Sequence, residues 1–320
     1  MFMLIILTII STAYASDLHL IQEQANSFKL NSFLALNNAA LCSYAQDSNL
    51  SMPEPDEVGL RYTFNRHGSN FSISDPIQSM FINDTALYNT MGQKANVLEI
   101  GAGFGLCAQK VFGLYHALHA NSDNENSNTL SYVGADISFE HLAVATNEIA
   151  KVNKDWLHYW KPIVSKFPFI LDDQYTHIGA FHVFHFLKPE EVIPGLKAIE
   201  NTLKPGGKVY ILTANPQTMA YGPLVQSIYT YKKNKGKSFP GYLEDTKKIH
   251  DASVAAGLMP EGAVENKGKS IPDHFLFMDT QELADLITCH TKLKVLWNST
   301  INTTVHTKTP KTYTGIIAEK

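Results

Sequence analysis

A carboxylate and three glycines alternate along one short stretch of the 320-residue chain. Glu99 stands two residues before Gly101, and Gly103 and Gly105 follow at alternate positions. Glycine permits positive φ, and its lack of a Cβ lets a ligand lie against the main chain. A carboxylate beside such a loop suits a cationic ligand and would repel a pyrophosphate. The spacing therefore predicts a small-molecule site for a ligand that carries positive charge.

A strand and a helix must hold this loop in place. Residues 96–100 read as a short strand with apolar residues at Val97, Leu98 and Ile100, and helical spacing begins at Leu106. A strand that runs through a glycine turn into a helix is how an open α/β sheet makes a pocket at its strand ends. The first N–H groups of that helix then face the ligand. A dinucleotide fingerprint needs a small residue where Leu106 stands, which disfavours a nicotinamide oxidoreductase.

The pattern Glu99-x-Gly101-x-Gly103-x-Gly105 resembles the first motif of the class I S-adenosylmethionine-dependent methyltransferases. In that family the loop packs against the methionine part of the cofactor, which carries a sulfonium and an ammonium. The resemblance implies that S-adenosyl-L-methionine is the cofactor, with Glu99 and the loop at its methionine end. The cofactor-binding residues that it implies are Glu99, Gly101, Ala102, Gly103, Gly105, Asp136 and Ile137, the last beside the adenine.

Two downstream stretches extend the resemblance. A predicted strand over residues 130–135 ends in Asp136, where the family carries an acid that accepts hydrogen bonds from both ribose hydroxyls. A carboxylate has enough lone pairs for that task. Ser138 is a good N-cap for the following helix, so Asp136 could equally support this turn. The sequence L-K-P-G-G at residues 203–207, expected as a turn before a strand over residues 208–213, is a second hallmark of the family.

The fourth predicted strand carries the candidate for catalysis. Residues 175–186 read as this strand and its exit, and Tyr175 and Thr176 replace the Phe-Asp pair that is common in the family. His182 occupies the position nearest the transferred methyl in many relatives, and a neutral imidazole could remove a proton from the acceptor. His182 and His185 without a third ligand make a poor metal site, so no metal is predicted.

The third strand has no clear signal. Residues 156–171 could form a strand, a helix or a loop. The acid that often touches the adenine after this strand is not evident either. Asp172 is a weak candidate, and a loop acid is the better interpretation of it. The sequence therefore places the methionine and ribose ends of the site more firmly than the adenine end.

The expected fold class is α/β, with a doubly wound, seven-stranded, mostly parallel sheet that has one reversed strand. Residues 16–94 are expected as an N-terminal helical cap or lead-in, and residues 95–320 as the methyltransferase-like domain. Residues 215–278 hold several aromatic side chains and read as an insertion that covers the acceptor site, because loops at this sheet edge carry selectivity. Residues 293–304 and 312–319 alternate like the two antiparallel strands that close the family's sheet.

The first 15 residues differ in composition from the rest. About ten apolar residues are followed by small ones that end in Ala13-Tyr14-Ala15. This pattern favours a cleaved export signal, too short for a membrane anchor, although the usual basic n-region is missing. The alternatives are a helix that packs on the domain or an over-extended start. Export also conflicts with a cofactor made in the cytosol, so a cytoplasmic location stays the alternative.

Composition excludes several classes of protein. Apolar residues make up 44% of the chain, charged residues make up 18%, and the formal net charge is -4. These values fit a soluble globular protein and give no reason to expect a nucleic-acid partner. Cys42, Cys107 and Cys289 form no even framework and no C-x-x-C pair, so neither a disulfide scaffold nor a zinc site is predicted. Nothing in the sequence indicates an oligomeric state.

The implied reaction is methyl transfer from S-adenosyl-L-methionine to an acceptor that the sequence does not identify. A deep, lidded pocket would favour a small molecule. One alternative is a non-catalytic protein that binds the same cofactor and regulates a partner. Aminopropyl transfer is disfavoured because the acid-rich loop that a polyamine requires is missing after the fourth strand. An assay for S-adenosylhomocysteine would separate the enzyme from the binding protein.

Overall fold

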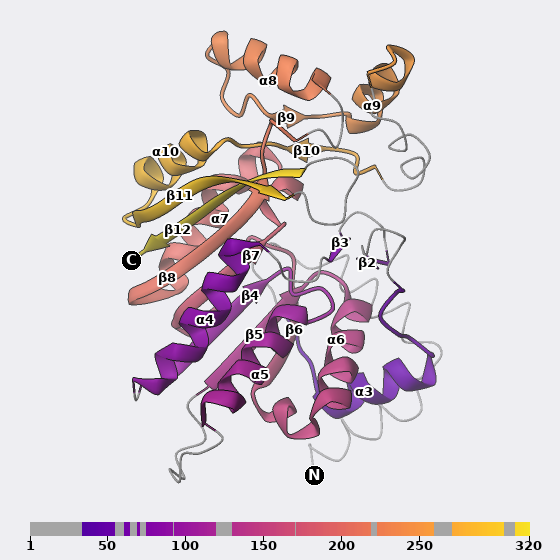
Figure 1. The fold of residues 1–320 in the computed structure, drawn as a ribbon, viewed down its shortest axis with the longest axis vertical. Helices are drawn as coiled ribbons and strands as arrows, with labels where there is room; N and C mark the ends of the chain where they lie inside the picture. The colour runs from indigo at the N-terminus through magenta and orange to yellow at the C-terminus, as the bar shows by residue number, and fades with distance from the viewer. Residues whose placement is uncertain are drawn as a thin grey trace.

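Within the part of the chain that the computed structural model describes, eight strands form one sheet in the order β1-β6-β5-β4-β7-β8-β12-β11 (Figure 1). The described residues are 34–54, 61–64, 69–70, 75–91, 93–119, 130–169, 171–218, 223–258, 271–303 and 311–320. The strands of the sheet are β1 (Leu34–Ala35), β4 (Ala95–Ile100), β5 (Leu130–Asp136), β6 (Trp160–Val164), β7 (Tyr175–Phe181), β8 (Leu203–Ala214), β11 (Lys294–Thr303) and β12 (Lys311–Glu319).

Most of the sheet is parallel. The neighbours β6, β5, β4, β7 and β8 all run in the same direction, whereas β12 is antiparallel to both β8 and β11. The predicted seven-stranded, mostly parallel sheet with one reversed strand is confirmed. The two-residue strand β1 adds an eighth member at the edge, antiparallel to β6, which the sequence did not predict.

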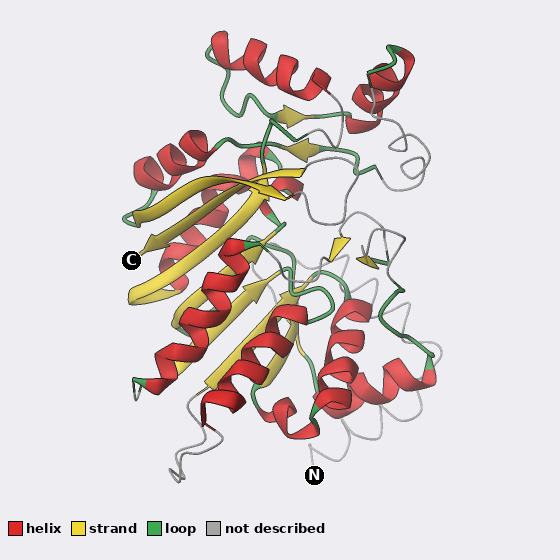
Figure 2. Ribbon diagram, in the orientation of Figure 1, coloured by secondary structure: helices red, strands yellow, loops and turns green. Residues whose placement is uncertain are grey.

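Helices cover both faces of the sheet (Figure 2). On one face lie α4 (Pro76–Thr90), α5 (Leu106–His119) and α6 (Phe139–Val152), and α3 (Asn38–Asp47) packs on α6. On the other face lie α7 (Pro189–Thr202) and α10 (Thr280–His290). Side chains alternate along a strand. In β4, Val97 therefore joins the core under α4 and α5, whereas Leu98 and Ile100 join the core under α7 and α10.

The third parallel strand, which the sequence left open, is β6, and the short helix η1 (Lys154–His158) precedes it. The ring of Trp160 lies over Gly134 of β5 so closely that a Cβ at residue 134 would overlap it. The indole Nε1–H donates to Thr146 Oγ1 at 2.9 Å. Pro162 and Lys161 hide the strand in the sequence, because a proline is unusual within a sheet. The strand forms because it pairs with β5, and a local sequence pattern does not reveal that pairing.

The L-K-P-G-G sequence was expected as a turn before a strand at Lys208, and this boundary is wrong. Strand β8 already begins at Leu203. Leu203 pairs with Tyr175 of β7, and Gly206 and Gly207 pair with the carboxyl end of the chain. The N–H of Gly206 donates to the carbonyl oxygen of Lys320 at 2.8 Å. The N–H of Lys320 donates to the carbonyl oxygen of Gly207 at 3.0 Å.

A smaller group of elements lies between β8 and α10 and projects from one end of the sheet (Figure 1). It comprises α8 (Pro223–Asn234), β9 (Tyr242–Leu243), α9 (Thr246–Ala255) and β10 (Phe275–Leu276), and β9 pairs with β10. Two further short strands, β2 (Arg61–Tyr62) and β3 (Ser69–Asn70), pair with each other before α4. These elements fall within residues 215–278, for which an insertion that covers the acceptor site stays a prediction.

No helix within the described ranges is long and apolar enough to cross a membrane. Residues 1–15, for which the sequence predicts an export signal, lie outside the described residues. Of the expected N-terminal lead-in over residues 16–94, residues 16–33 and a few shorter stretches lie outside them as well.

Candidate functional site

The glycine loop lies at the carboxyl end of β4, as the sequence predicts. Gly101, Gly103 and Gly105 have φ angles of 74°, 53° and 70°. A residue with a Cβ costs about 1–2 kcal/mol in this left-handed region. At Gly101 there is also no space, because a Cβ would lie 2.5 Å from Cγ2 of Val183. Glycine is therefore required by conformation at three positions and additionally by packing at Gly101.

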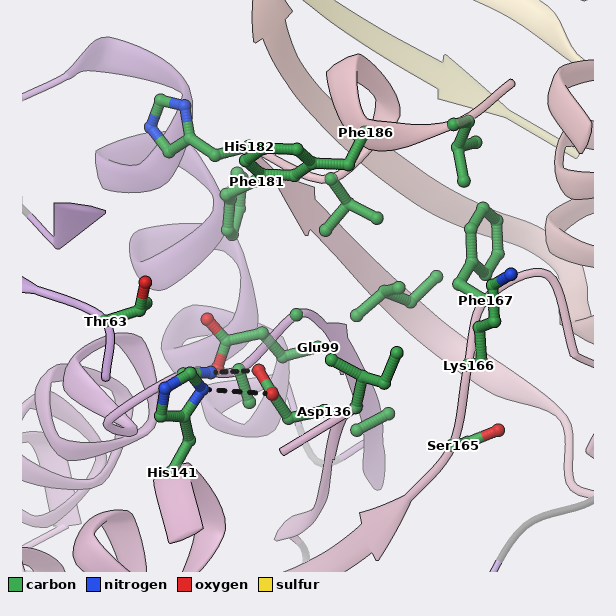
Figure 3. A pocket seen from close by; sticks show the side chains of 18 of the residues that line it. Thr63, Glu99, Asp136, His141, Ser165, Lys166, Phe167, Phe181, His182 and Phe186 are labelled. Atoms are coloured by element: carbon green, nitrogen blue, oxygen red, sulfur yellow. Dashed lines mark hydrogen bonds and ion pairs between the residues drawn. The ribbon is translucent and has the colours of Figure 1, made fainter. Parts of the chain in front are cut away.

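Asp136, the last residue of β5, fastens this loop (Figure 3). Its Oδ2 accepts a hydrogen bond from the N–H of Gly103 at 2.8 Å. Its Oδ1 accepts from the N–H of Ser138 at 2.8 Å and lies 3.2 Å from Nδ1 of His141. A carboxylate has about four acceptor positions, so these three donors leave about one for a ligand. The alternative that Asp136 supports the turn at the N-cap Ser138 therefore holds in the structure.

Glu99 is the second acid of the site and is only 4% exposed. The hydroxyl of Tyr132 donates to Glu99 Oε2 at 2.8 Å. Burial raises the pKa of Glu99 to about 8, because the charged form loses its water. The hydrogen bonds from Tyr132 and Cys107 lower the pKa in part, and the charge of Asp136 raises it further. A cation beside Glu99 would favour the ionised carboxylate.

Both acids face one cavity of about 410 Å³ at the carboxyl ends of the parallel strands. Six of the seven cofactor-binding residues implied by the sequence line it, and Gly105 does not. A Cβ at Gly105 would lie 3.0 Å from the Cβ of Ala145, so this glycine serves the packing of the loop on α6. Ile137 is 58% exposed and offers an apolar surface at the cavity.

The cavity has two contrasting sides. We call one the glycine-loop side, which comprises Glu99, Gly101, Ala102, Gly103, Asp136, Ile137 and His141. We call the other the aromatic side, which comprises Phe181, His182, Phe186, Pro272, Asp273 and His274. In Figure 3, Phe181, His182 and Phe186 lie across the cavity from Glu99, Asp136 and His141.

His182, the candidate catalytic residue, lies at the cavity end of β7. Its φ is 60°, which is unusual for a residue with a side chain. Its N–H donates to the carbonyl oxygen of Leu212 at 2.8 Å, and its ring lies 4.8 Å from that of Tyr313. Such conformations concentrate at functional sites and cost about 1–3 kcal/mol. The structure therefore places His182 where the sequence predicted, in a conformation that the surrounding chain must enforce.

The cavity is also lined by two histidines, His141 and His274, that the sequence did not single out. His141 follows Asp136 by five residues, on the first turn of α6, and that spacing was the signal that could have identified it. His274 comes from the chain just before β10. Its Nε2 lies 3.0 Å from the carbonyl oxygen of Phe186. A carbonyl only accepts, so Nε2 carries the hydrogen and Nδ1 keeps its lone pair. No local pattern in the sequence points to His274.

The adenine-contacting acid that the sequence could not place is not supplied by Asp172. This side chain is exposed and does not line the cavity. The residues that follow β6 and line the cavity are Ser165, Lys166, Phe167 and Phe169. The N–H of Ser165 donates to the backbone carbonyl oxygen of Asp136 at 2.9 Å, so this segment continues the wall that β5 begins.

Comparison with known proteins points to the same part of the chain. Residues 98–211, from β4 to β8, match a family model described as a methyltransferase domain. No curated protein matches the chain. This segment contains the glycine loop, Asp136, His141 and His182.

Solved structures of similar fold include three methyltransferases. An S-adenosylmethionine-dependent methyltransferase from Methanosarcina mazei has 16% identity over 73% of this chain and 96% of its own, with a TM-score of 0.47. Magnesium protoporphyrin IX methyltransferase from Synechocystis PCC 6803 has 13% identity over 75% of this chain and 82% of its own, with a TM-score of 0.42. An N-methyltransferase from Bradyrhizobium japonicum has 10% identity over 78% of this chain and 89% of its own, with a TM-score of 0.43.

Proposed function

We propose that the cavity binds S-adenosyl-L-methionine and that the protein methylates a small molecule, since residues 98–211 match a model of a methyltransferase domain. The observation that carries this proposal is the meeting of two buried acids, Glu99 and Asp136, with a left-handed glycine loop at one cavity. When bound, S-adenosylmethionine supplies a methyl group on a sulfonium, which is already a good leaving group. The protein's task is then alignment and exclusion of water.

The glycine-loop side fits the methionine end of this cofactor. Glu99 supplies the negative charge, and its pKa is raised because burial removes water from the ionised form. The loop at Gly101 and Gly103 presents bare main chain, as a ligand in close contact requires. A pyrophosphate would meet Glu99 and Asp136 together, so the same residues disfavour a dinucleotide.

The ribose and adenine ends follow from the neighbouring strands. Asp136 keeps about one acceptor position after its three donors, enough for a ribose hydroxyl. A fork to both hydroxyls requires that one of those donors turns away. Ile137 covers one face of the adenine with its exposed apolar side chain. Lys166 and Phe167, which follow β6, line the cavity near this end.

The aromatic side holds the methyl acceptor. Phe181 and Phe186 provide apolar walls that suit a small, flat molecule. His182 accepts a proton from the acceptor as its oxygen or nitrogen takes the methyl group, and general bases contribute about 10²- to 10⁴-fold. His274, whose Nδ1 keeps a lone pair, is the second candidate for this role. The variants His182→Asn and His274→Asn separate the two.

The decisive experiment supplies labelled S-adenosylmethionine and a metabolite extract to the purified protein. Mass spectrometry then identifies the compound that gains a methyl group, and S-adenosylhomocysteine is quantified in parallel. The proposal expects both products in proportion. Binding without S-adenosylhomocysteine formation would instead support the alternative, a protein that binds the cofactor and regulates a partner.

We further propose that residues 1–15 form an export signal, on the basis of their apolar run and the Ala13-Tyr14-Ala15 sequence. N-terminal sequencing of the mature protein tests this. A mature chain that begins at Ser16 would agree with export, and one that begins at Met1 would favour a cytoplasmic enzyme.

A further inference from the structure

One buried histidine connects two parts of the cavity wall that are far apart in the sequence. His141 is 4% exposed and lines the cavity. Its Nδ1 lies 3.2 Å from Asp136 Oδ1, and its Nε2 lies 3.2 Å from the backbone nitrogen of Phe64. The first contact reaches β5, and the second reaches the segment that contains β2.

These two partners determine where the imidazole carries its hydrogen. The backbone N–H of Phe64 can only donate, so Nε2 of His141 must supply a lone pair. The hydrogen of the neutral ring then lies on Nδ1, which donates to the carboxylate of Asp136. A neutral ring satisfies both contacts at once, and a hydrogen bond to a carboxylate is the stronger kind.

Packing holds the imidazole in this position. The ring centroid of His141 lies 5.0 Å from that of Phe104 and 5.4 Å from that of Phe64. The two phenylalanine rings lie 5.4 Å apart, edge to face. The imidazole of His141 is thus enclosed by Phe104, which follows Gly103, and by Phe64, whose N–H donates to Nε2 of the same imidazole. The side chain of Ser138 further fixes the backbone, since it accepts from the N–H of His141 at 3.1 Å.

Residues 61–64 form a strap whose end is held by this contact. Thr63 lines the cavity, and Phe64 is the residue bonded to His141. In Figure 3, Thr63 lies beside His141, on the side away from Lys166 and Phe167. Through His141 the position of Thr63 depends on the orientation of Asp136, which in turn holds Gly103.

We propose that His141 is a positioning residue that orients Asp136 for the ribose and fastens the 61–64 strap at the wall of the cavity. The inference rests on the proposed function for the ribose contact. It does not rest on it for the strap. His141 acts through Asp136 and Phe64. Its Nδ1 contacts Asp136 and its Nε2 contacts Phe64, so different substitutions can remove one contact and keep the other.

Three variants divide those tasks. His141→Asn places an amide nitrogen near the position of Nδ1, so it keeps the bond to Asp136 and loses the bond to Phe64. His141→Gln places a carbonyl oxygen near the position of Nε2, so it keeps the bond to Phe64 and loses the other. His141→Leu keeps apolar volume and loses both. His290→Gln, at the exposed end of α10, is the control.

Two measurements follow these variants. The first is the dissociation constant for S-adenosylhomocysteine. We expect it to rise about tenfold in His141→Gln and His141→Leu and to stay within about threefold of the wild type in His141→Asn. The second is hydrogen exchange of the Phe64 amide without ligand. We expect about tenfold faster exchange in His141→Asn and His141→Leu, and wild-type exchange in His141→Gln.

The outcomes test the role of His141 and the proposed function separately. Equal effects of all three variants on both readouts would overturn the inference, because they would show that only ring packing matters. Unchanged affinity in His141→Leu would overturn the role toward Asp136. A wild-type protein that ignores S-adenosylhomocysteine would contradict the proposed function, whereas the Phe64 exchange pattern would still test the strap. The control variant must match the wild type in both measurements.

Discussion

The two sides of the cavity are built in different ways. On the glycine-loop side, the main chain of the loop is joined to the neighbouring strand: the N–H of Gly103 donates to Asp136, which lies 33 positions later. On the aromatic side, side chains from separate segments meet, and His274 reaches the carbonyl of Phe186 across 88 positions. A side assembled from distant side chains can change its acceptor without changing the fold.

This contrast makes a general prediction. Substitutions on the glycine-loop side should change affinity for S-adenosylmethionine, and substitutions on the aromatic side should change turnover with little effect on that affinity. The expected effect on cofactor affinity decreases from Gly101→Ala to His182→Asn.

Gly101→Ala should abolish cofactor binding, with a loss of more than about 100-fold, or roughly 2.8 kcal/mol. Its Cβ would lie 2.5 Å from Val183, and its φ of 74° is unfavourable for alanine. Gly206→Ala is the matched control. Gly206 has a φ of 75°, but nothing lies within 4 Å of the Cβ that alanine would add there. Calorimetric titration of both variants checks this, and equal losses would show that the close approach at Gly101 is irrelevant.

Asp136→Asn should weaken cofactor binding about 30-fold, or roughly 2 kcal/mol. Either orientation of the amide turns its NH₂ group toward a backbone N–H, that of Gly103 or that of Ser138. Asp172→Asn, an exposed acid outside the cavity, should leave the dissociation constant unchanged. The account would be wrong if the two variants bound the cofactor alike.

The pKa of Glu99 predicts how cofactor affinity depends on pH. In the free protein this carboxyl is protonated below about pH 8, whereas a cationic ligand favours its ionised form. Affinity should therefore rise nearly tenfold per pH unit between pH 6 and 7.5 and level off near pH 8. Binding heats in buffers of different ionisation enthalpy should show release of one proton. Glu99→Gln should bind more weakly at pH 8 and lose the pH dependence.

Glu99 should affect stability with the opposite sign. Its pKa is raised from 4.5 to about 8 by folding, so the folded state binds more protons than the unfolded state within this window. The free energy of unfolding should therefore fall as pH rises from about 4.5 to 8, and this part of the fall should disappear in Glu99→Gln. Urea unfolding of both proteins at pH 5 and pH 8 measures the difference. A steeper fall in the variant would contradict the assignment.

His182→Asn should change cofactor affinity less than about twofold and reduce turnover about 100-fold. Asparagine tolerates the left-handed backbone at this position, so the fold is preserved. His290→Asn on the surface of α10 serves as the control. Methyl transfer into the metabolite extract gives the turnover. If His182→Asn lost cofactor affinity instead, the division of the cavity into two sides would fail at this residue.

The sequence predicted the elements whose signals are local. Strands β4 and β5 combine apolar runs with glycine or aspartate at their ends, and the loop at Gly101 needs its φ whatever surrounds it. Strand β6 stayed undecided between strand, helix and loop, because its identity depends on Trp160 covering Gly134. The start of β8 was misplaced because Tyr175 and the distant residue Lys320 pair with it.

The candidate site divides along the same line. Glu99 and Asp136 could be selected because their spacing from strand ends is fixed by the fold. His141 has such a spacing too, but its importance comes from the contact with Phe64, 77 residues earlier. His274 has no spacing signal at all, since the elements between β8 and α10 bring it to the cavity. Sequence reasoning therefore reaches the cofactor better than the acceptor.

The central claim is that the corner formed by Glu99, the glycine loop and Asp136 binds S-adenosylmethionine. Equilibrium titration of the purified protein with this compound tests it most directly, with Gly103→Asp and Asp136→Ala measured alongside and checked for folding by their unfolding curves. The account predicts saturable one-to-one binding well below millimolar concentration and its loss in both variants. Absence of binding at millimolar concentration, or equal binding by the wild type and both variants, would contradict it.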